Sequence, residues 1–330
     1  MSNHTLYYAT NRNHLLNKDS TGSQFRPDAY GSSFSSSGYE NLRFGKLSVQ
    51  GTQAEISKHL NKSPKGIGQG DGLGLASYFT NRAKSAKIQA YREKDKGPND
   101  SSTALGSKAM FEDLKAEMDK DSDVLVYIHG FNVSWHEAVG AALSLQTILN
   151  AKGNKPVVVV LFSWPSDGKM IPYASYRSDR ADAEASGKPV ARGLLKVRDF
   201  LIELGRDRRN LCNRDIHLLC HSMGNYVLQN SLAAMQVFNH NQPLPRLFEQ
   251  VFLCAADVDD NSLEPGQPLS CAHQICRNLS IYHNHEDNAL VISDYTKGQP
   301  ERLGGNGSAR PNQLHNKVHQ IDCQPLVHGV

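Results

Sequence analysis

The sequence predicts an α/β fold with a mostly parallel central sheet and helices on both of its faces. From about residue 121 onward, short runs of apolar and β-branched residues alternate with longer amphipathic segments, a pattern typical of strands joined by crossover helices. The runs are apolar at successive positions, as strands buried on both faces require. The composition agrees, because 39% hydrophobic and 21% charged residues are ordinary for a globular chain.

Strands are expected at the apolar runs, and helices where apolar residues recur at helical spacing. Apolar residues at 138, 142, 145 and 149 line one face of a helix. Further helices are expected at 194–204 and 228–235. The expected core strands lie at 123–129, 156–164, 215–220, 250–256, 279–283 and 317–323. Functional groups gather at the carboxyl ends of strands in such a sheet, so the chemistry is expected there.

The first third of the chain is expected to be looser. Ser, Gly, Asp and Pro dominate residues 18–38, which predicts a loop between short strands at 6–10 and 42–49. The glycine-rich stretch 61–75 matches no phosphate-binding motif and is expected to be a surface loop.

One domain is expected over residues 1–330, with a loop-rich N-terminal region carrying edge strands (1–120) and a core (121–330). Lys and Arg total 36 and Asp and Glu 33, a net charge of +3, which argues against a nucleic-acid or membrane-surface binder. The longest strongly apolar run, 157–162, is too short to span a bilayer. The polar first ten residues and six scattered cysteines predict a cytoplasmic protein with reduced thiols and no integral membrane segment.

A serine at the end of the strand 215–220 has the surroundings of a nucleophile. Ser222 lies between strand and helix and has small residues two positions to either side, Cys220 and Gly224, which is the pattern of a nucleophile elbow. The turn is so tight that only small residues fit beside it, and it lifts the Ser222 hydroxyl above the sheet. Cys220 departs from the usual glycine. The alternative is that Ser222 only caps a helix.

A second turn predicts the oxyanion side of the site. His129 and Gly130 end the first core strand, where an H-G-x turn commonly supplies a backbone N–H to an oxyanion hole. We assign the two donors to the amides of Phe131 and Met223. Each such donor lowers the barrier by about 3 kcal/mol. The alternative is that Gly130 is only a turn residue and His129 a packed strand end.

These motifs resemble the α/β-hydrolase superfamily, and more closely its bacterial esterase/lipase-like branch known as domain of unknown function 900. The resemblance spans nearly the whole chain. It implies an α/β-hydrolase fold, a serine-hydrolase mechanism and no required cofactor. The matching segments are 8–12 (YATNR), 129–134 (HGFNVS), 162–168 (FSWPSDG), 221–225 (HSMGN), 256–259 (ADVD) and 287–290 (DNAL).

A serine nucleophile needs a histidine base that a carboxylate orients. In this fold the chain order is Ser, then Asp or Glu, then His. Asp287 follows the strand 279–283 and matches the family motif, so we assign it as the acid. Asp257 follows the preceding strand in the same way and is the alternative.

The base is expected beyond the last strand, where the sequence offers His328. His319 lies inside that strand, and His315 precedes it. Either His328 is the base or the base lies beyond Val330.

Two other groups of residues suggest chemistry. His283, His285 and Asp287 approach metal-ligand spacing, but Asn288 stands where a metallo-hydrolase has a further ligand, so no metal site is expected. The polar segment 165–189 is expected to be a loop that either shapes the substrate pocket or is an ordinary surface loop. It carries Tyr173, Tyr176, Arg177, Asp179 and Arg180.

The expected activity is the hydrolysis of a carboxylic ester, from a small-molecule or lipid-like substrate, through an acyl-enzyme. The same residues are consistent with a thioesterase, an amidase or an acyltransferase. A non-catalytic binding protein that keeps the fold and lacks a competent base is the alternative from another class.

Overall fold

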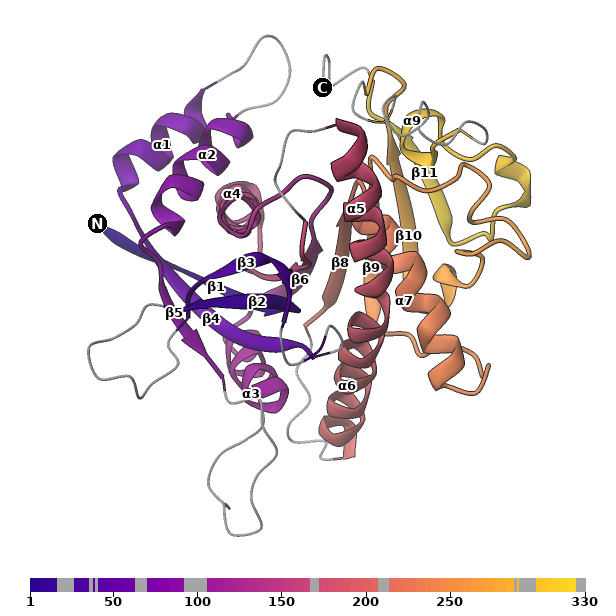
Figure 1. Ribbon diagram of the computed structural model, residues 1–330, viewed down its shortest axis with the longest axis horizontal. Helices are drawn as coiled ribbons and strands as arrows, with labels where there is room; N and C mark the ends of the chain where they lie inside the picture. Colours follow the sequence, from indigo (N-terminus) through magenta and orange to yellow (C-terminus); the bar gives the residue numbers. More distant parts are fainter. Residues whose placement is uncertain are drawn as a thin grey trace. The chain divides into compact units, whose positions relative to one another are not determined.

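The computed structural model shows two compact units, each built from several segments of the chain (Figure 1). The first contains Met1–Leu125, Ser134–Pro165 and Asp199–Arg214, and the second contains Val126–Val133, Ser166–Arg198 and Asp215–Val330. The structure describes residues 1–16, 27–35, 38, 41–62, 70–91, 106–166, 172–206, 214–287, 290 and 301–324.

The first unit holds a mixed set of strands in the order β7-β1-β4-β5. Strand β1 is parallel to β7 and antiparallel to β4, which is antiparallel to β5. Helix α2 packs against α4. The elements of this unit are β1 (Ser2–Thr10), β2 (Arg12–Leu16), β3 (Pro27–Phe34), β4 (Arg43–Gly51), α1 (Gln53–Asn61), α2 (Gly72–Ala83), β5 (Lys87–Ala90), α3 (Gly106–Met118), α4 (Trp135–Lys152) and β7 (Val157–Ser163).

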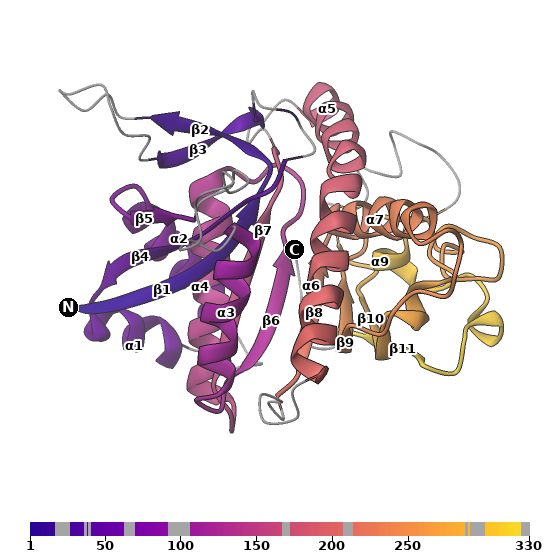
Figure 2. The ribbon, with the colours of Figure 1, turned by 90° about the horizontal axis from the view of Figure 1, so that it is seen from below.

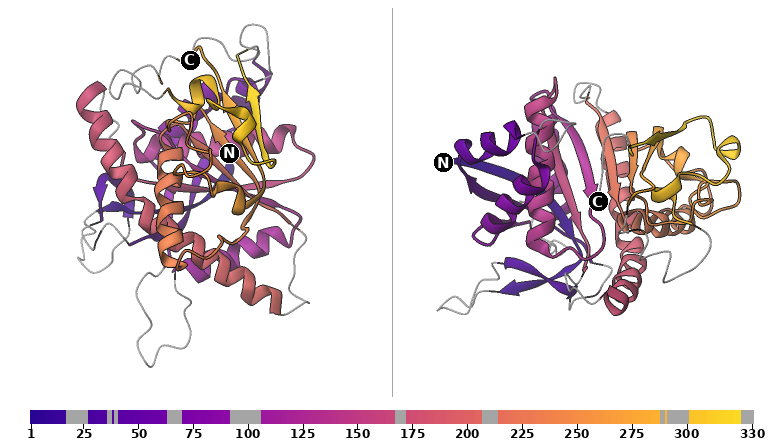
Figure 3. Two further views of the ribbon diagram at one scale, coloured as in Figure 1. Left: turned by 90° about the vertical axis from the view of Figure 1, so that its right-hand side faces the viewer. Right: turned by 90° about the horizontal axis from the view of Figure 1, so that it is seen from above.

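The second unit holds a parallel set of strands in the order β11-β10-β9-β8, side by side in Figure 2. Strand β11, in yellow, forms the edge of this set (Figure 3). Helix α5 packs against α7. The elements are α5 (Pro172–Ala185), β8 (Ile216–His221), α7 (Gly224–Phe238), β9 (Phe248–Cys254), β10 (Cys276–His283), α9 (Leu303–Asn306) and β11 (Val318–Asp322). Strand β6 (Asp123–Ile128) and helix α6 (Gly187–Arg206) each have residues in both units.

In strands β8, β9 and β10, buried positions alternate with partly exposed ones, and most of β11 is exposed, so the burial on both faces that the apolar runs predicted is not found in these strands. Leu253, Leu279 and Ile281 are completely buried. Because these strands are parallel, their carboxyl ends lie along one edge, and the turns that follow them meet there. The expected α/β fold with a mostly parallel sheet is confirmed.

The prediction of a loop over residues 18–38 is wrong for 27–34, which form strand β3 and pair antiparallel with β2. Tyr30 anchors this strand, because its hydroxyl lies 2.7 Å from that of Tyr8 and its ring lies 4.6 Å from that of Trp135. Aromatic packing between distant segments therefore outweighs the local preference of Gly and Ser for turns.

The loop predicted over 61–75 is wrong at its end, because α2 begins at Gly72. The carboxylate of Asp71 caps this helix by accepting a hydrogen bond from the Gly74 amide (2.8 Å), so the glycines here lie in a capped first turn. Residues 63–69 lie outside the described residues.

The loop predicted over 165–189 is also wrong, because it contains helix α5 and the beginning of α6. Tyr176, Asp179 and Ala183 line the buried face of α5. A charged residue in the middle of that face interrupts the apolar periodicity by which a helix is recognised.

Among the described residues, no helix combines the length and the apolar character needed to cross a membrane.

Candidate active site

Ser222 lies at the sharp turn between β8 and α7. Its φ of 50° falls in the left-handed region, which is uncommon for a residue with a side chain and is maintained only where neighbouring groups fix the backbone. Two segments do so here. The Ser222 amide donates to the carbonyl of Cys254 (2.9 Å), and the Ser222 carbonyl accepts from the amides of Asn225 (3.0 Å) and Asp257 (3.2 Å).

The small residues on either side of the turn have separate reasons. A methyl group at Gly224 would lie 2.6 Å from the carbonyl oxygen of Ile128 and 2.7 Å from that of His129, so only glycine fits. Cys220 is completely buried, and burial raises the pKa of its thiol. It is therefore a packed neutral thiol, unsuited to act as a nucleophile.

The alternative role of Ser222 as a helix cap is not supported by the geometry. The residue at the N-cap of α7 is Met223, whose side chain makes no capping hydrogen bond. The Ser222 hydroxyl is therefore not used for capping, which leaves it available for chemistry.

The turn after β6 lies directly against Ser222. A methyl group at Gly130 would be 2.8 Å from Cβ of Ser222 and 3.1 Å from Nδ1 of His221. His129 is completely buried, and its Nδ1 lies 2.9 Å from the Gly130 carbonyl oxygen. It therefore supports the turn from the protein interior.

The two amides assigned to the oxyanion hole flank this contact. Phe131 follows Gly130, and Met223 follows Ser222. Among the described residues, neither amide donates a hydrogen bond to a protein acceptor. The next two amides of the turn are occupied: Asn132 donates to Asp179 (3.0 Å) and Val133 donates to Ser166 (3.0 Å).

The two candidate acids have different surroundings. Asp287 is buried after β10, and its carboxylate accepts a hydrogen bond from the Leu290 amide (3.4 Å). Desolvation by the surrounding protein lowers the pKa of His221, and the negative charge of Asp287 opposes this shift. His221 is nevertheless exposed to solvent. The Asp287 charge is therefore felt at the residue next to Ser222.

Asp257 is already engaged by other side chains. It is completely enclosed, and both carboxylate oxygens accept from the hydroxyl of Tyr176 (2.9 and 3.1 Å). Arg302 lies 3.6 Å and Arg180 3.9 Å from this carboxylate. These contacts join Asp257 to helix α5 and to Arg302.

The predicted base, His328, lies outside the described residues. His319 is exposed on β11, and His315 stacks on His273 with ring centroids 3.9 Å apart. The chain that leaves β11 passes along the loop that carries Asp287, because the Gln324 side chain donates to Glu286 (3.1 Å).

Helix α5 adds residues to the site that the sequence placed on a loop. The ring of Tyr176 contacts that of Phe131 edge-on, with centroids 5.6 Å apart, while its hydroxyl reaches Asp257. Arg180 stacks over the ring of Tyr226, 3.5 Å from its centroid. The available signal was the helical spacing of Tyr176, Asp179 and Ala183, which includes a charge.

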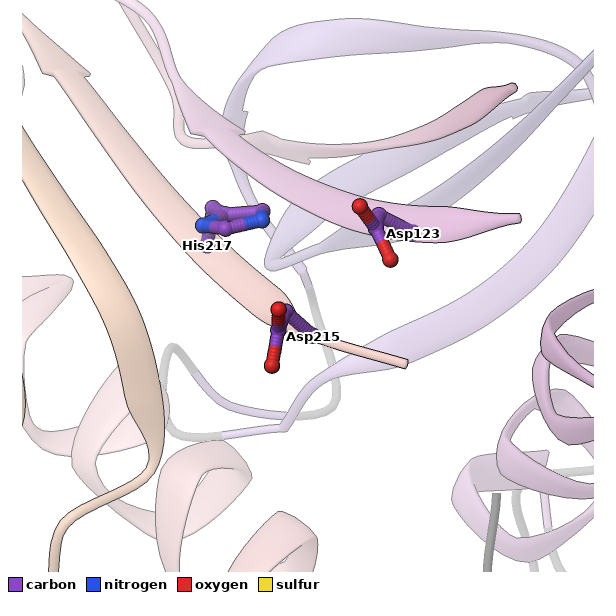
Figure 4. Close-up of side chains that lie close together, drawn as sticks. All are labelled: Asp123, Asp215 and His217. Atoms are coloured by element: carbon purple, nitrogen blue, oxygen red, sulfur yellow. The ribbon is translucent and has the colours of Figure 1, made fainter. Parts of the chain in front are cut away.

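Two groups of residues resemble metal ligands. Among the described residues, His283, His285 and Asp287 do not gather three ligand atoms. Figure 4 shows Asp215 and His217 at the start of β8 in the second unit, and Asp123, which begins β6 in the first. The pair on β8 supplies fewer ligands than the three or four of a zinc site, so we assign no metal to it.

Comparison with protein families matched residues 106–329 to the family described as alpha/beta hydrolase of unknown function (DUF900). Searches of curated proteins and of solved structures returned no match. The matched region contains both turns, both candidate acids and His328. The chain therefore belongs to this family of α/β hydrolases.

Proposed function

We propose that the protein is a serine hydrolase that cleaves a carboxylic ester through an acyl-enzyme. The observation that supports this most strongly is the strained turn at Ser222, whose φ of 50° persists because backbone hydrogen bonds fix it. Conformational strain at a single backbone position is typical of functional sites. The α/β-hydrolase family membership supports the same conclusion at a coarser level.

In the proposed reaction, the Ser222 oxygen attacks the ester carbonyl carbon while the histidine base takes its proton. The carbonyl oxygen becomes an oxyanion and receives hydrogen bonds from the Phe131 and Met223 amides, worth about 3 kcal/mol each. Collapse of this intermediate breaks the ester bond, and the histidine returns the proton to the leaving alcohol. Water, deprotonated by the same histidine, then releases the acid and regenerates Ser222. No cofactor is required.

We assign the base to His328. Gln324 is hydrogen-bonded to the residue preceding Asp287, and four residues of extended chain reach about 14 Å at most. A histidine at 328 is thus within reach of an acid held on that loop. Asp287 would orient its imidazole and stabilise the imidazolium that forms.

The substrate is proposed to be a small-molecule or lipid-like ester. Phe131, whose amide is an assigned oxyanion donor, is partly exposed, and its ring packs on the buried ring of Tyr176, so we propose that the Phe131 ring adjoins the reacting carbonyl. Apolar and aromatic walls with a few polar groups are usual in sites for such substrates.

The test is labelling by a fluorophosphonate probe, which reacts covalently with an activated serine. Wild type should be labelled and Ser222→Ala should not. Ser231→Ala is a matched control, because Ser231 is a buried serine on α7 whose hydroxyl donates to the Val227 carbonyl (2.6 Å); it should label like wild type. A folded wild type that resists the probe would favour the non-catalytic binding protein instead.

A further inference from the structure

We propose that Asp179, on helix α5, is a positioning residue that holds the oxyanion turn in its active orientation. The inference rests on the proposed function and names a residue whose role lies behind the reacting atoms. The Asp179 carboxylate binds the backbone that follows Phe131, rather than Ser222 or the assigned donor amides.

One oxygen of the Asp179 carboxylate organises two successive amides. Its Oδ2 accepts from the Asn132 amide at 3.0 Å and from the Ser166 hydroxyl at 2.5 Å. The Ser166 oxygen in turn accepts from the Val133 amide at 3.0 Å. A side chain 46 or 47 residues away in sequence thus fixes the turn 131–133.

These bonds determine which amide of the turn remains for the substrate. Asn132 and Val133 are occupied, whereas the Phe131 amide donates to no described protein acceptor. The Phe131 N–H and the Gly130 carbonyl belong to one planar peptide and point in opposite directions. Because His129 Nδ1 lies 2.9 Å from the Gly130 oxygen, the carbonyl is held on one side and the N–H is directed to the other.

The backbone at Asn132 explains why such a clamp is needed. Its φ of 57° lies in the left-handed region, which is uncommon for residues with a side chain, although asparagine adopts it more often than most. Rotation there would release the peptide that carries the Phe131 N–H. The bond from the Asn132 amide to Asp179 opposes this rotation.

Burial supports a positioning role for the carboxylate. Asp179 and Ser166 are both completely buried, and a buried carboxylate is costly unless hydrogen bonds compensate it. On the same face of α5, Tyr176 contacts the Phe131 side chain. The helix therefore holds both the ring and the following backbone of the residue that supplies the donor.

The test compares four variants with p-nitrophenyl acetate as substrate and phenylboronic acid as transition-state analogue. Asp179→Ala removes the acceptor, Asp179→Asn retains one oxygen, and Ser166→Ala removes the second link. Ser186→Ala is the control: it loses a buried hydroxyl that follows the end of α5 and donates to the Asp182 carbonyl (2.7 Å), not to the oxyanion turn.

Asp179→Ala should lower kcat by about 100-fold, because displacing a catalytic group by about 1 Å has an effect of that size, with KM nearly unchanged. The affinity for phenylboronic acid should fall by a similar factor. Ser166→Ala should show a smaller loss of the same kind, Asp179→Asn should recover most of the activity, and Ser186→Ala should match wild type in both measurements.

The outcomes separate this inference from the proposed function. If wild type hydrolyses the ester while folded Asp179→Ala and Ser166→Ala keep its kcat and its boronate affinity, the positioning role is wrong and the serine mechanism stands. If Asp179→Ala does not fold, Ser166→Ala decides the question. Equal damage in the Asn and Ala variants would also overturn the assignment. A folded wild type that neither labels with a fluorophosphonate nor hydrolyses the ester would overturn both proposals.

Discussion

Replacing Gly130 by alanine should disable the site with little effect on the rest of the fold. The added methyl group would lie 2.8 Å from Cβ of Ser222, whereas carbon atoms pack best about 3.5 Å or more apart. The turn or the serine must therefore move by about 0.7 Å. The φ of Gly130 lies outside the left-handed region, so alanine fits its backbone, and the cost comes from the contact alone.

A displacement near 1 Å at reacting groups lowers rates by about 100-fold, while overpacking of this kind costs about 1–3 kcal/mol of stability. We therefore expect the fluorophosphonate labelling rate to fall by about 100-fold in a variant that still unfolds cooperatively. Gly305→Ala is the control, because nothing lies within 4 Å of the added methyl group. Labelling of Gly130→Ala at the wild-type rate would show that the two turns do not meet as described.

Three further outcomes are expected. Asp287→Asn should lower kcat by about 10⁴-fold with thermal stability maintained. Asp257→Asn should chiefly destabilise the fold, by about 3 kcal/mol in chemical denaturation, because it breaks a buried ion pair. The reverse pattern of effects would exchange the roles of the two residues. His328→Ala should abolish ester hydrolysis in a protein with an unchanged circular dichroism spectrum, and retained activity would reject it as the base. Desolvation, and then the nearby His315, hold the pKa of His273 below its ordinary 6.5, so the unfolded chain binds protons more readily than the folded one. The melting temperature should therefore decline as the pH falls below 6.5. A decline of equal size in His273→Ala would contradict this cause.

The elements that the sequence predicted well are those whose conformation depends on a single local requirement. Strands β8 and β9 contain short apolar runs at 218–220 and 251–254, because their inward-facing side chains are buried. Such runs can be recognised without knowing the partners of the strand. The tight turn at Ser222 was predicted for a similar reason, since its steric demand restricts immediate neighbours such as Gly224. In both cases the residues that determine the local structure lie within a few positions of it in the sequence.

Strand β3 and helix α5 were missed because the contacts that stabilise them come from distant parts of the sequence. Tyr30 is fixed by Tyr8 and Trp135, and nothing in the polar stretch around Tyr30 reveals those partners. Asp179 is fixed by backbone amides of another segment. A buried carboxylate looks like a solvent-facing charge in a sequence, so it predicted a loop where the structure has a helix.

The choice between the two acids shows the same limit within the site. Asp257 and Asp287 both follow parallel strands, and position along the chain does not separate them. Their partners do, because Asp257 faces a tyrosine hydroxyl and two guanidinium groups, whereas the charge of Asp287 acts on the imidazole beside Ser222. A carboxylate whose oxygens are already shared with a tyrosine hydroxyl and two guanidinium groups would orient the imidazole of a proton carrier poorly. In the proposed mechanism, the two acids would therefore differ in role because of their neighbours, which only the folded chain brings to them.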